Sequence, residues 1–209
     1  MQFQLVSAFV TLFVVVDPVG VAVVAGGLTH GLSRDSRRSI AIRGTLIAGV
    51  LLILFAFGGE WLLRALGIGV PALRVAGGVL LFLLAIDMVF ARPSGIRNPT
   101  APEQEEASHR NDIAVFPLAF PLLAGPGALT SVVLLMARAG TPADSALVIG
   151  ALMAVLVLAF LALRFTDRVT RLLGVTGANV VGRISGVILA ALAAQFVLDG
   201  LAEGLPRLG

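Results

Sequence analysis

The chain is a succession of long apolar runs separated by short polar loops. The first run, 3–28, carries a single charged residue, and the fifth, 145–163, carries none. A helix needs about 20 predominantly apolar residues to cross the hydrocarbon core of a bilayer. The pattern therefore predicts six membrane-spanning helices. In chain order they cover residues 3–28, 40–57, 71–91, 113–137, 145–163 and 180–203.

The third run has the weakest signal of the six, because only residues 75–86 are free of charge. That stretch is shorter than a span requires. We retain the span because Arg74 and Arg92 can extend their side chains from its two ends towards the membrane interfaces. The long polar segment that follows, 92–111, is predicted to be a linker.

Composition supports a membrane protein with one transmembrane domain, 1–209. Hydrophobic residues make up 58% of the chain and charged residues 13%, whereas soluble domains average roughly 25% charged residues. The mean hydropathy is +1.01. The chain has no cysteine, so it has no disulfide. Its net charge of +3 does not indicate a nucleic-acid partner, because the basic residues lie in short loops between apolar runs.

All fifteen basic residues are arginines, and their distribution predicts the topology. Eleven follow the first, third and fifth spans and four lie at the opposite ends, which predicts that the three arginine-rich loops, including the linker 92–111, face the cytoplasm. Both termini are then outside a cell inner (plasma) membrane. The eleven are Arg34, Arg37, Arg38, Arg43, Arg92, Arg97, Arg110, Arg164, Arg168, Arg171 and Arg183, and the four are Arg64, Arg74, Arg138 and Arg207.

Two of the runs are interrupted at corresponding places. Asp17-Pro18-Val19-Gly20 lies halfway along the first run, and residues 121–127, with two prolines and two glycines, lie in the fourth. Proline removes a backbone donor, and an acid at mid-bilayer costs about 2.5–3.5 kcal/mol. Two interrupted spans in corresponding halves indicate the binding site of a secondary transporter. The alternative is that the prolines only kink the helices.

The chain also partly matches itself after a shift of 108 residues. Pro18 falls on Pro126, Gly78-Val79 on Gly186-Val187, and Asp87 on Gln195. The first repeat, 1–91, and the second, 112–209, then hold three spans each, and three is odd, so the second must be inverted. The predicted fold is therefore an all-α membrane protein with six transmembrane helices as two inverted three-helix repeats, with helices 1 and 4 broken at mid-membrane.

The candidate substrate-binding residues lie at or near the two interruptions. They are Asp17, Pro18, Gly20, Gly125, Pro126, Gly127, Thr130, Ser131 and Gln195. Half-helix N-termini attract a carboxylate and free carbonyls attract an ammonium, and a zwitterionic amino acid has both groups. Thr130 and Ser131 either bind substrate or bond back to their own helix. Gln195 either reaches the site or makes a hydrogen bond between helices.

The sequence leaves two roles open for Asp17. It is either a helix cap before Pro18 or the coupling site of an ion-driven transporter, with a proton or sodium as the candidate ion. Asp87 and Asp199 lie towards span ends, where a solvated carboxylate is expected. His30 and His109 lie in loops and are not expected to take part.

Four stretches resemble the MarC family of bacterial and archaeal inner-membrane proteins, which includes the SnatA-type transporters of small neutral amino acids. They are Asp17-Pro18-Val19-Gly20, residues 69–78, residues 116–127 with the block Pro121-Leu122-Leu123-Ala124-Gly125-Pro126-Gly127, and residues 195–200. The resemblance implies a six-helix transporter fold and, for some members, cation-coupled uptake of glycine or alanine. The family often has Asn where this chain has Asp17.

These observations predict a secondary transporter that moves glycine- or alanine-like amino acids by alternating access. An efflux protein or a channel for other small solutes is the alternative. An intramembrane enzyme is disfavoured, because the predicted spans contain no histidine, no cysteine and no second acid at mid-span. We expect no cofactor and no bound metal.

Overall fold

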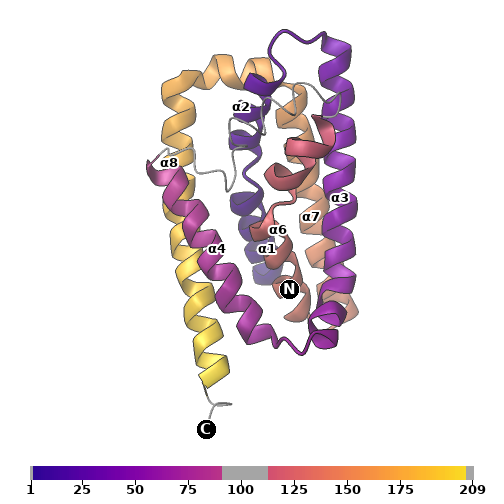
Figure 1. Cartoon of the computed structure of the whole chain (residues 1–209), viewed down its shortest axis with the longest axis vertical. Coiled ribbons are helices and arrows are strands. Elements are labelled where there is room, and N and C mark those ends of the chain that lie inside the picture. Colours follow the sequence, from indigo (N-terminus) through magenta and orange to yellow (C-terminus); the bar gives the residue numbers. More distant parts are fainter. Residues whose placement is uncertain (1, 91–112, 206–209) are drawn as a thin grey trace.

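A computed structural model describes residues 2–90 and 113–205, and every regular element within them is a helix (Figure 1). The elements are α1 (Gln2–Val16), α2 (Pro18–Leu28), α3 (Arg34–Ala65), α4 (Val70–Phe90), η1 (Ala114–Leu123), α6 (Pro126–Ala137), α7 (Pro142–Arg164) and α8 (Thr166–Gly204). The predicted linker 92–111 lies outside the described residues.

The described part of the chain runs back and forth along one long axis. Five stretches are long and apolar enough to cross a membrane, and η1 with α6, bent by 54°, makes a sixth if the pair is one span. α1 begins and α8 ends towards the same end of the bundle, the lower end in Figure 1. The loop before α3 and the start of α8 lie at the opposite, upper end.

Two helices are longer than their apolar runs. α3 begins at Arg34, where the Ser33 hydroxyl accepts the backbone N–H of Ser36 at 3.2 Å, and it ends before Gly67, which has φ 70°. α8 begins at Thr166 and contains one non-helical residue, Gly174, with φ 61°. The predicted span 40–57 is therefore the apolar part of a helix that continues as polar turns, whereas the span 180–203 lies in the part of α8 that follows the kink at Gly174.

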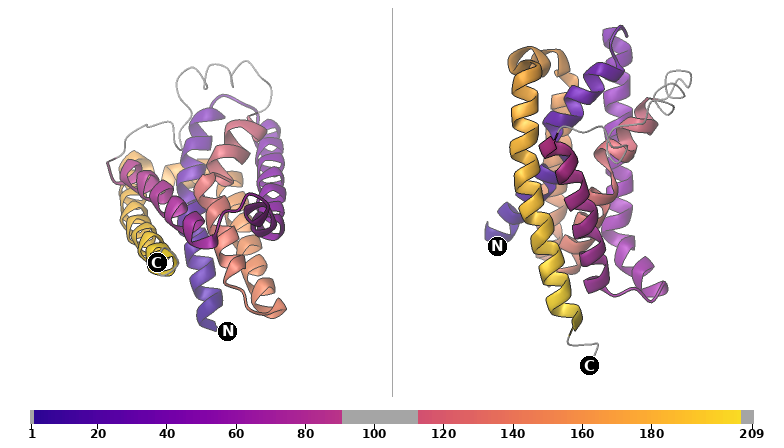
Figure 2. Two further views of the ribbon diagram at one scale, coloured as in Figure 1. Left: turned by 60° about the horizontal axis from the view of Figure 1, so that its bottom comes forward. Right: turned by 60° about the vertical axis from the view of Figure 1, so that its left-hand side comes forward.

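α4 and α8 pack along each other, at the left of Figure 1 and side by side again in Figure 2. Their backbones approach closely at two glycines. A Cβ on Gly78 would lie 2.8 Å from the carbonyl oxygen of Ala193, and a Cβ on Gly186 would lie 3.0 Å from the nitrogen of Val89. Small residues allow such close helix contacts in membranes, where apolar burial provides little driving force.

Arg74 pairs with a residue that is distant in the sequence. It is only 3% exposed and forms an ion pair with Glu203 of α8. Glu203 lies in the last turn of α8 and its side chain is 54% exposed. The guanidinium is therefore covered by the bundle while its partner carboxylate reaches solvent.

Candidate functional site

The helical path is interrupted at Asp17, which separates α1 from α2. Its backbone is left-handed, with φ 47° and ψ 71°, and its carboxylate Oδ1 accepts the backbone N–H of Gly20 at 3.0 Å. Pro18 is the first residue of α2, where its missing N–H costs nothing. Asp17 is 5% exposed. The aspartate is therefore a buried N-cap of α2, in an unusual conformation that Asp tolerates better than most residues.

Gly20 is required by this cap. A Cβ on Gly20 would lie 2.1 Å from Oδ2 of Asp17. The carboxylate occupies the volume that any side chain at this position would need.

A second interruption lies between η1 and α6. Phe116 and Phe120 are extended, each directly before a proline joined by a cis peptide bond. The residue before a proline is driven out of the helical region by its ring, so the Phe-Pro pairs explain the irregular path of η1. The helix restarts at Pro126 with Gly125 as its N-cap.

No side chain caps α6. The first N–H groups that α6 offers belong to Gly127 and Ala128, and within the described residues neither has a hydrogen-bond partner. The free amides and the helix dipole together make this N-terminus favourable for an anion.

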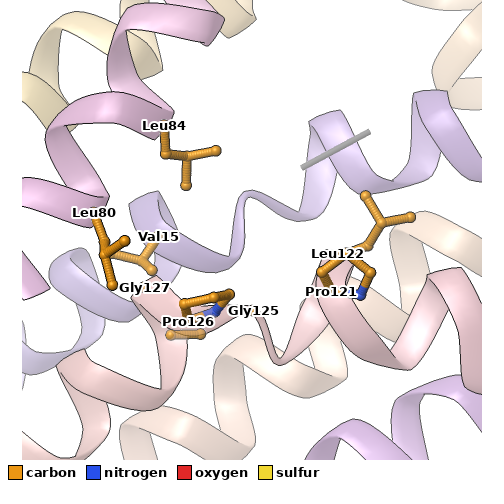
Figure 3. A pocket seen from close by; sticks show the side chains of 9 residues that line it. Val15, Leu80, Leu84, Pro121, Leu122, Gly125, Pro126 and Gly127 are labelled. Atoms are coloured by element: carbon orange, nitrogen blue, oxygen red, sulfur yellow. The ribbon is translucent and has the colours of Figure 1, made fainter. Parts of the chain in front are cut away.

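The two interruptions lie side by side around one small pocket (Figure 3). Val15, two residues before Asp17, lies against Gly127, where an added Cβ would be 3.5 Å from its methyl group. The other lining side chains are apolar and come from α4, η1 and α6: Leu80, Leu84, Pro121, Leu122, Pro126 and Ala128. Backbone groups therefore provide the polarity of this pocket.

The pocket has a volume of about 40 Å³, far below the roughly 300–1,000 Å³ of typical small-molecule sites. α2 runs from its break to the upper end of the bundle and α6 runs from its break to the lower end (Figure 1). The N-termini of both helices are thus at the level of the pocket. Since Pro18 and Pro126 have no N–H, the carbonyls of Val14 and Leu122 also lose their helical partners there.

Most of the predicted site residues lie at or near the interruptions. Gly125, Pro126 and Gly127 line the pocket. Asp17, Pro18 and Gly20 form the first interruption, from which the preceding Val15 reaches the pocket. Thr130 and Ser131 follow in α6 and are buried. The Thr130 methyl packs on Gly77, and the Ser131 hydroxyl, fully buried, has no hydrogen-bond partner among the described residues.

Gln195 lies apart from these groups. Its side chain is exposed and donates to Oδ1 of Asp199 at 2.6 Å, and Oδ2 of Asp199 accepts from Arg138, the residue that follows α6, also at 2.6 Å. The structure does not bring Gln195 to the interruptions. Asp199 stays partly exposed, as expected for a carboxylate towards a span end, and its ion pair with Arg138 joins α8 to the end of α6.

No group of three or more His, Cys, Asp or Glu side chains within residues 2–90 and 113–205 could hold a metal ion. The chemistry available at the interruptions is therefore that of backbone dipoles, one carboxylate and buried hydroxyls. Such groups bind and orient a small polar solute.

The apolar helices define a multi-pass integral membrane protein. The chain belongs to the MarC family of integral membrane proteins, whose model matches residues 2–205. It is 38% identical over 202 residues to a UPF0056 membrane protein of Archaeoglobus fulgidus, covering 95% of this chain and 92% of that protein. It is 33% identical over 205 residues to the UPF0056 membrane protein YvbG of Bacillus subtilis, covering 98% and 97%. No solved structure matches the chain.

Proposed function

We propose that the chain is a secondary transporter of small neutral amino acids, of the SnatA type within its family. The observation that carries the proposal is the meeting of two helix interruptions at one pocket, one with a buried carboxylate and one with free amides. Helix interruptions of this kind hold substrates and coupling ions in secondary transporters.

A zwitterionic amino acid fits the polarity of this arrangement. Its carboxylate is expected at the amides of Gly127 and Ala128, at the positive end of α6. Its ammonium is expected at Asp17 or at the carbonyl oxygen of Val14. The two charged groups of the substrate would then bridge the two interruptions.

Size favours glycine and alanine. The pocket of about 40 Å³ is far smaller than the roughly 300–1,000 Å³ of typical small-molecule sites, so an amino acid requires this arrangement to open. Leu80 and Leu84 project from α4 into the remaining space (Figure 3), and they would oppose a bulky side chain.

The contacts between α4 and α8 support an inverted repeat. Gly78 meets Val197, and Gly186 meets Val89. A shift of 108 residues converts the first pair into the second, because 78 becomes 186 and 89 becomes 197. Reciprocal contacts of this kind are typical of two units related by a two-fold axis. They favour alternating access by movement of one repeat against the other.

The proposal also includes a location and an orientation. The arginine distribution favours a cell inner membrane with both termini outside. A C-terminal reporter that is active only in the cytoplasm should be silent, and an active reporter would contradict this topology.

Uptake into proteoliposomes tests the function. Purified protein should accumulate labelled glycine and alanine several-fold over leucine and lysine, and a proton or sodium gradient should increase the accumulation. Protein-free liposomes given the same labelled amino acids provide the background. Equal uptake of all four amino acids, or none above that background, would contradict the proposal.

A further inference from the structure

A second hollow lies at the end of the bundle where α3 and α8 begin, the upper end in Figure 1. Its volume is about 400 Å³, ten times that of the pocket between the interruptions. We refer to it as the arginine pocket, because six arginines line it: Arg34, Arg37, Arg38, Arg164, Arg168 and Arg171.

The charge of the arginine pocket is poorly balanced within the described residues. Asp167 is the one acidic residue among those that line it, and its Oδ1 pairs with Arg37 at 2.7 Å. The other five arginines have no ion-pair partner in the described part of the chain. The Nε of Arg37 is buried and without a hydrogen-bond partner there. The pocket therefore holds donors that an anion would satisfy.

Helix stability does not explain three of these arginines, whereas Arg164 lies in the last turn of α7, where a cation is favourable. Arg34 and Arg37 lie in the first turn of α3, and Arg168 lies in the first turn of α8. A helix N-terminus carries partial positive charge, so cations there are unfavourable. The two N-termini and the guanidinium groups add their positive potentials at the same place, which is the arrangement that binds phosphate.

Aromatic stacking positions two of the guanidinium groups. The Cζ atoms of Arg164 and Arg168 lie 5.9 and 5.1 Å from the centre of the Phe165 ring. Phe165 is itself 41% exposed, and Leu172 on the same segment is 86% exposed. Apolar side chains thus accompany the cationic pocket at the ends of the membrane-spanning helices.

We propose that the arginine pocket binds the phosphate headgroup of an anionic phospholipid from the surrounding bilayer. The guanidinium groups would pair with the phosphate oxygens, and the acyl chains would lie along exposed apolar side chains such as Leu172. The arginine distribution predicts that this end faces the cytoplasm, where anionic lipids attract basic residues near the surface. A free phosphate would satisfy the same donors but would gain nothing from the apolar surroundings.

The test measures lipid binding to the full chain in neutral detergent by native mass spectrometry. Phosphatidylglycerol should bind saturably, and phosphatidylcholine and inorganic phosphate should bind at least tenfold more weakly. The double variant Arg34→Gln/Arg38→Gln should weaken phosphatidylglycerol binding by about 25-fold, since each basic residue near an anionic surface contributes about fivefold.

The matched control is Arg64→Gln/Arg183→Gln, which removes the same charge at two exposed positions outside the pocket. It should change binding by less than about twofold. An equal loss in both double variants, or equal binding of phosphatidylglycerol and phosphatidylcholine, would overturn the proposal. Binding of inorganic phosphate as tight as that of phosphatidylglycerol would also overturn the proposal. Melting temperatures without lipid identify any variant whose loss comes from misfolding, and Arg171→Gln then replaces it.

Discussion

Asp17 and Gly125 are each the N-cap before a proline, and they lie 108 residues apart, the shift of the proposed repeat. At Asp17 the carboxylate caps α2 through the N–H of Gly20. At Gly125 no side chain caps α6. The residue three positions after each cap differs accordingly. Gly20 leaves room for the Asp17 carboxylate. Ala128, three residues after Gly125, can carry a methyl group because Gly125 has no side chain that would compete for the space.

This difference gives the two interruptions opposite polarity. The first holds a buried carboxyl group that accepts the amide of Gly20, and the second offers amides without a side-chain cap. Two identical interruptions would present the same group twice. The pair found here presents a carboxylate on one side and amides on the other, and an amino acid carries an ammonium and a carboxylate. The difference between positions 17 and 125 would therefore orient a bound amino acid.

The largest effect is expected from Gly125→Ala at the uncapped interruption. Its Cβ would lie 2.4 Å from the carbonyl oxygen of Pro121, and a backbone atom cannot move aside as a side chain can. We expect a loss of about 1–3 kcal/mol in stability, a lower melting temperature and no glycine uptake. Gly150→Ala is the control, because nothing lies within 4 Å of its Cβ. Equal melting temperatures for the two variants would show that the interruption is not tightly packed.

At the capped interruption, Gly20→Ala should remove the hydrogen bond from Gly20 to Asp17, because the new methyl group and the carboxylate compete for one volume. Loss of an N-cap costs about 1 kcal/mol, up to about 2. Gly27→Ala lies on the same helix with open space around its Cβ and should stabilise by up to about 1 kcal/mol. Thermal unfolding of the two variants measures the contrast. A Gly20→Ala protein as stable as Gly27→Ala would contradict the cap.

Both interruptions could be predicted from the sequence because their causes are local. Proline, glycine and aspartate act on the backbone within one turn, and the spacing between Asp17 and Gly20 already contains the cap. The ends of α3 could not be predicted from hydropathy, since a helix can continue past its apolar run as polar turns, and the kink at Gly174 of α8 leaves no hydropathy signal. Apolar runs mark only the part of a helix that lipid would cover.

Side-chain pairs between residues distant in the sequence could not be predicted, for a different reason. Arg74 meets Glu203 across 129 positions, and nothing near Arg74 reveals that partner. Gln195 matched the internal repeat, yet its side chain bonds to Asp199, one turn further along the same helix. The arginine distribution predicts the topology, but it does not reveal that arginines from separate loops share one site. Only the fold brings six of them together around the arginine pocket.

A smaller effect is expected from Ser131→Ala, one turn beyond the uncapped interruption. The hydroxyl is fully buried without a partner in the described residues, so its removal should leave the melting temperature unchanged or slightly higher. If the hydroxyl bonds to the substrate in the open state, the apparent affinity for glycine should fall by about fivefold. Thr130→Val, which keeps the methyl group against Gly77, is the control. A clear loss of stability in Ser131→Ala would assign the hydroxyl to the helix instead.

Asp17→Asn should have the smallest effect on stability and the most informative effect on transport. Asparagine caps a helix nearly as well as aspartate and tolerates the left-handed backbone, so the melting temperature should stay within about 1 °C of the parent, well below the 2–4 °C that 1 kcal/mol produces in a chain of this size. An amide cannot carry a proton. If Asp17 couples transport to a proton gradient, the variant should lose gradient-driven accumulation of glycine and keep exchange of labelled for unlabelled glycine. If the variant accumulates glycine as the parent does, Asp17 acts only as a cap. The coupling ion must then bind to backbone carbonyls at the interruptions, such as that of Val14, and the two interruptions would differ in structure without differing in mechanism.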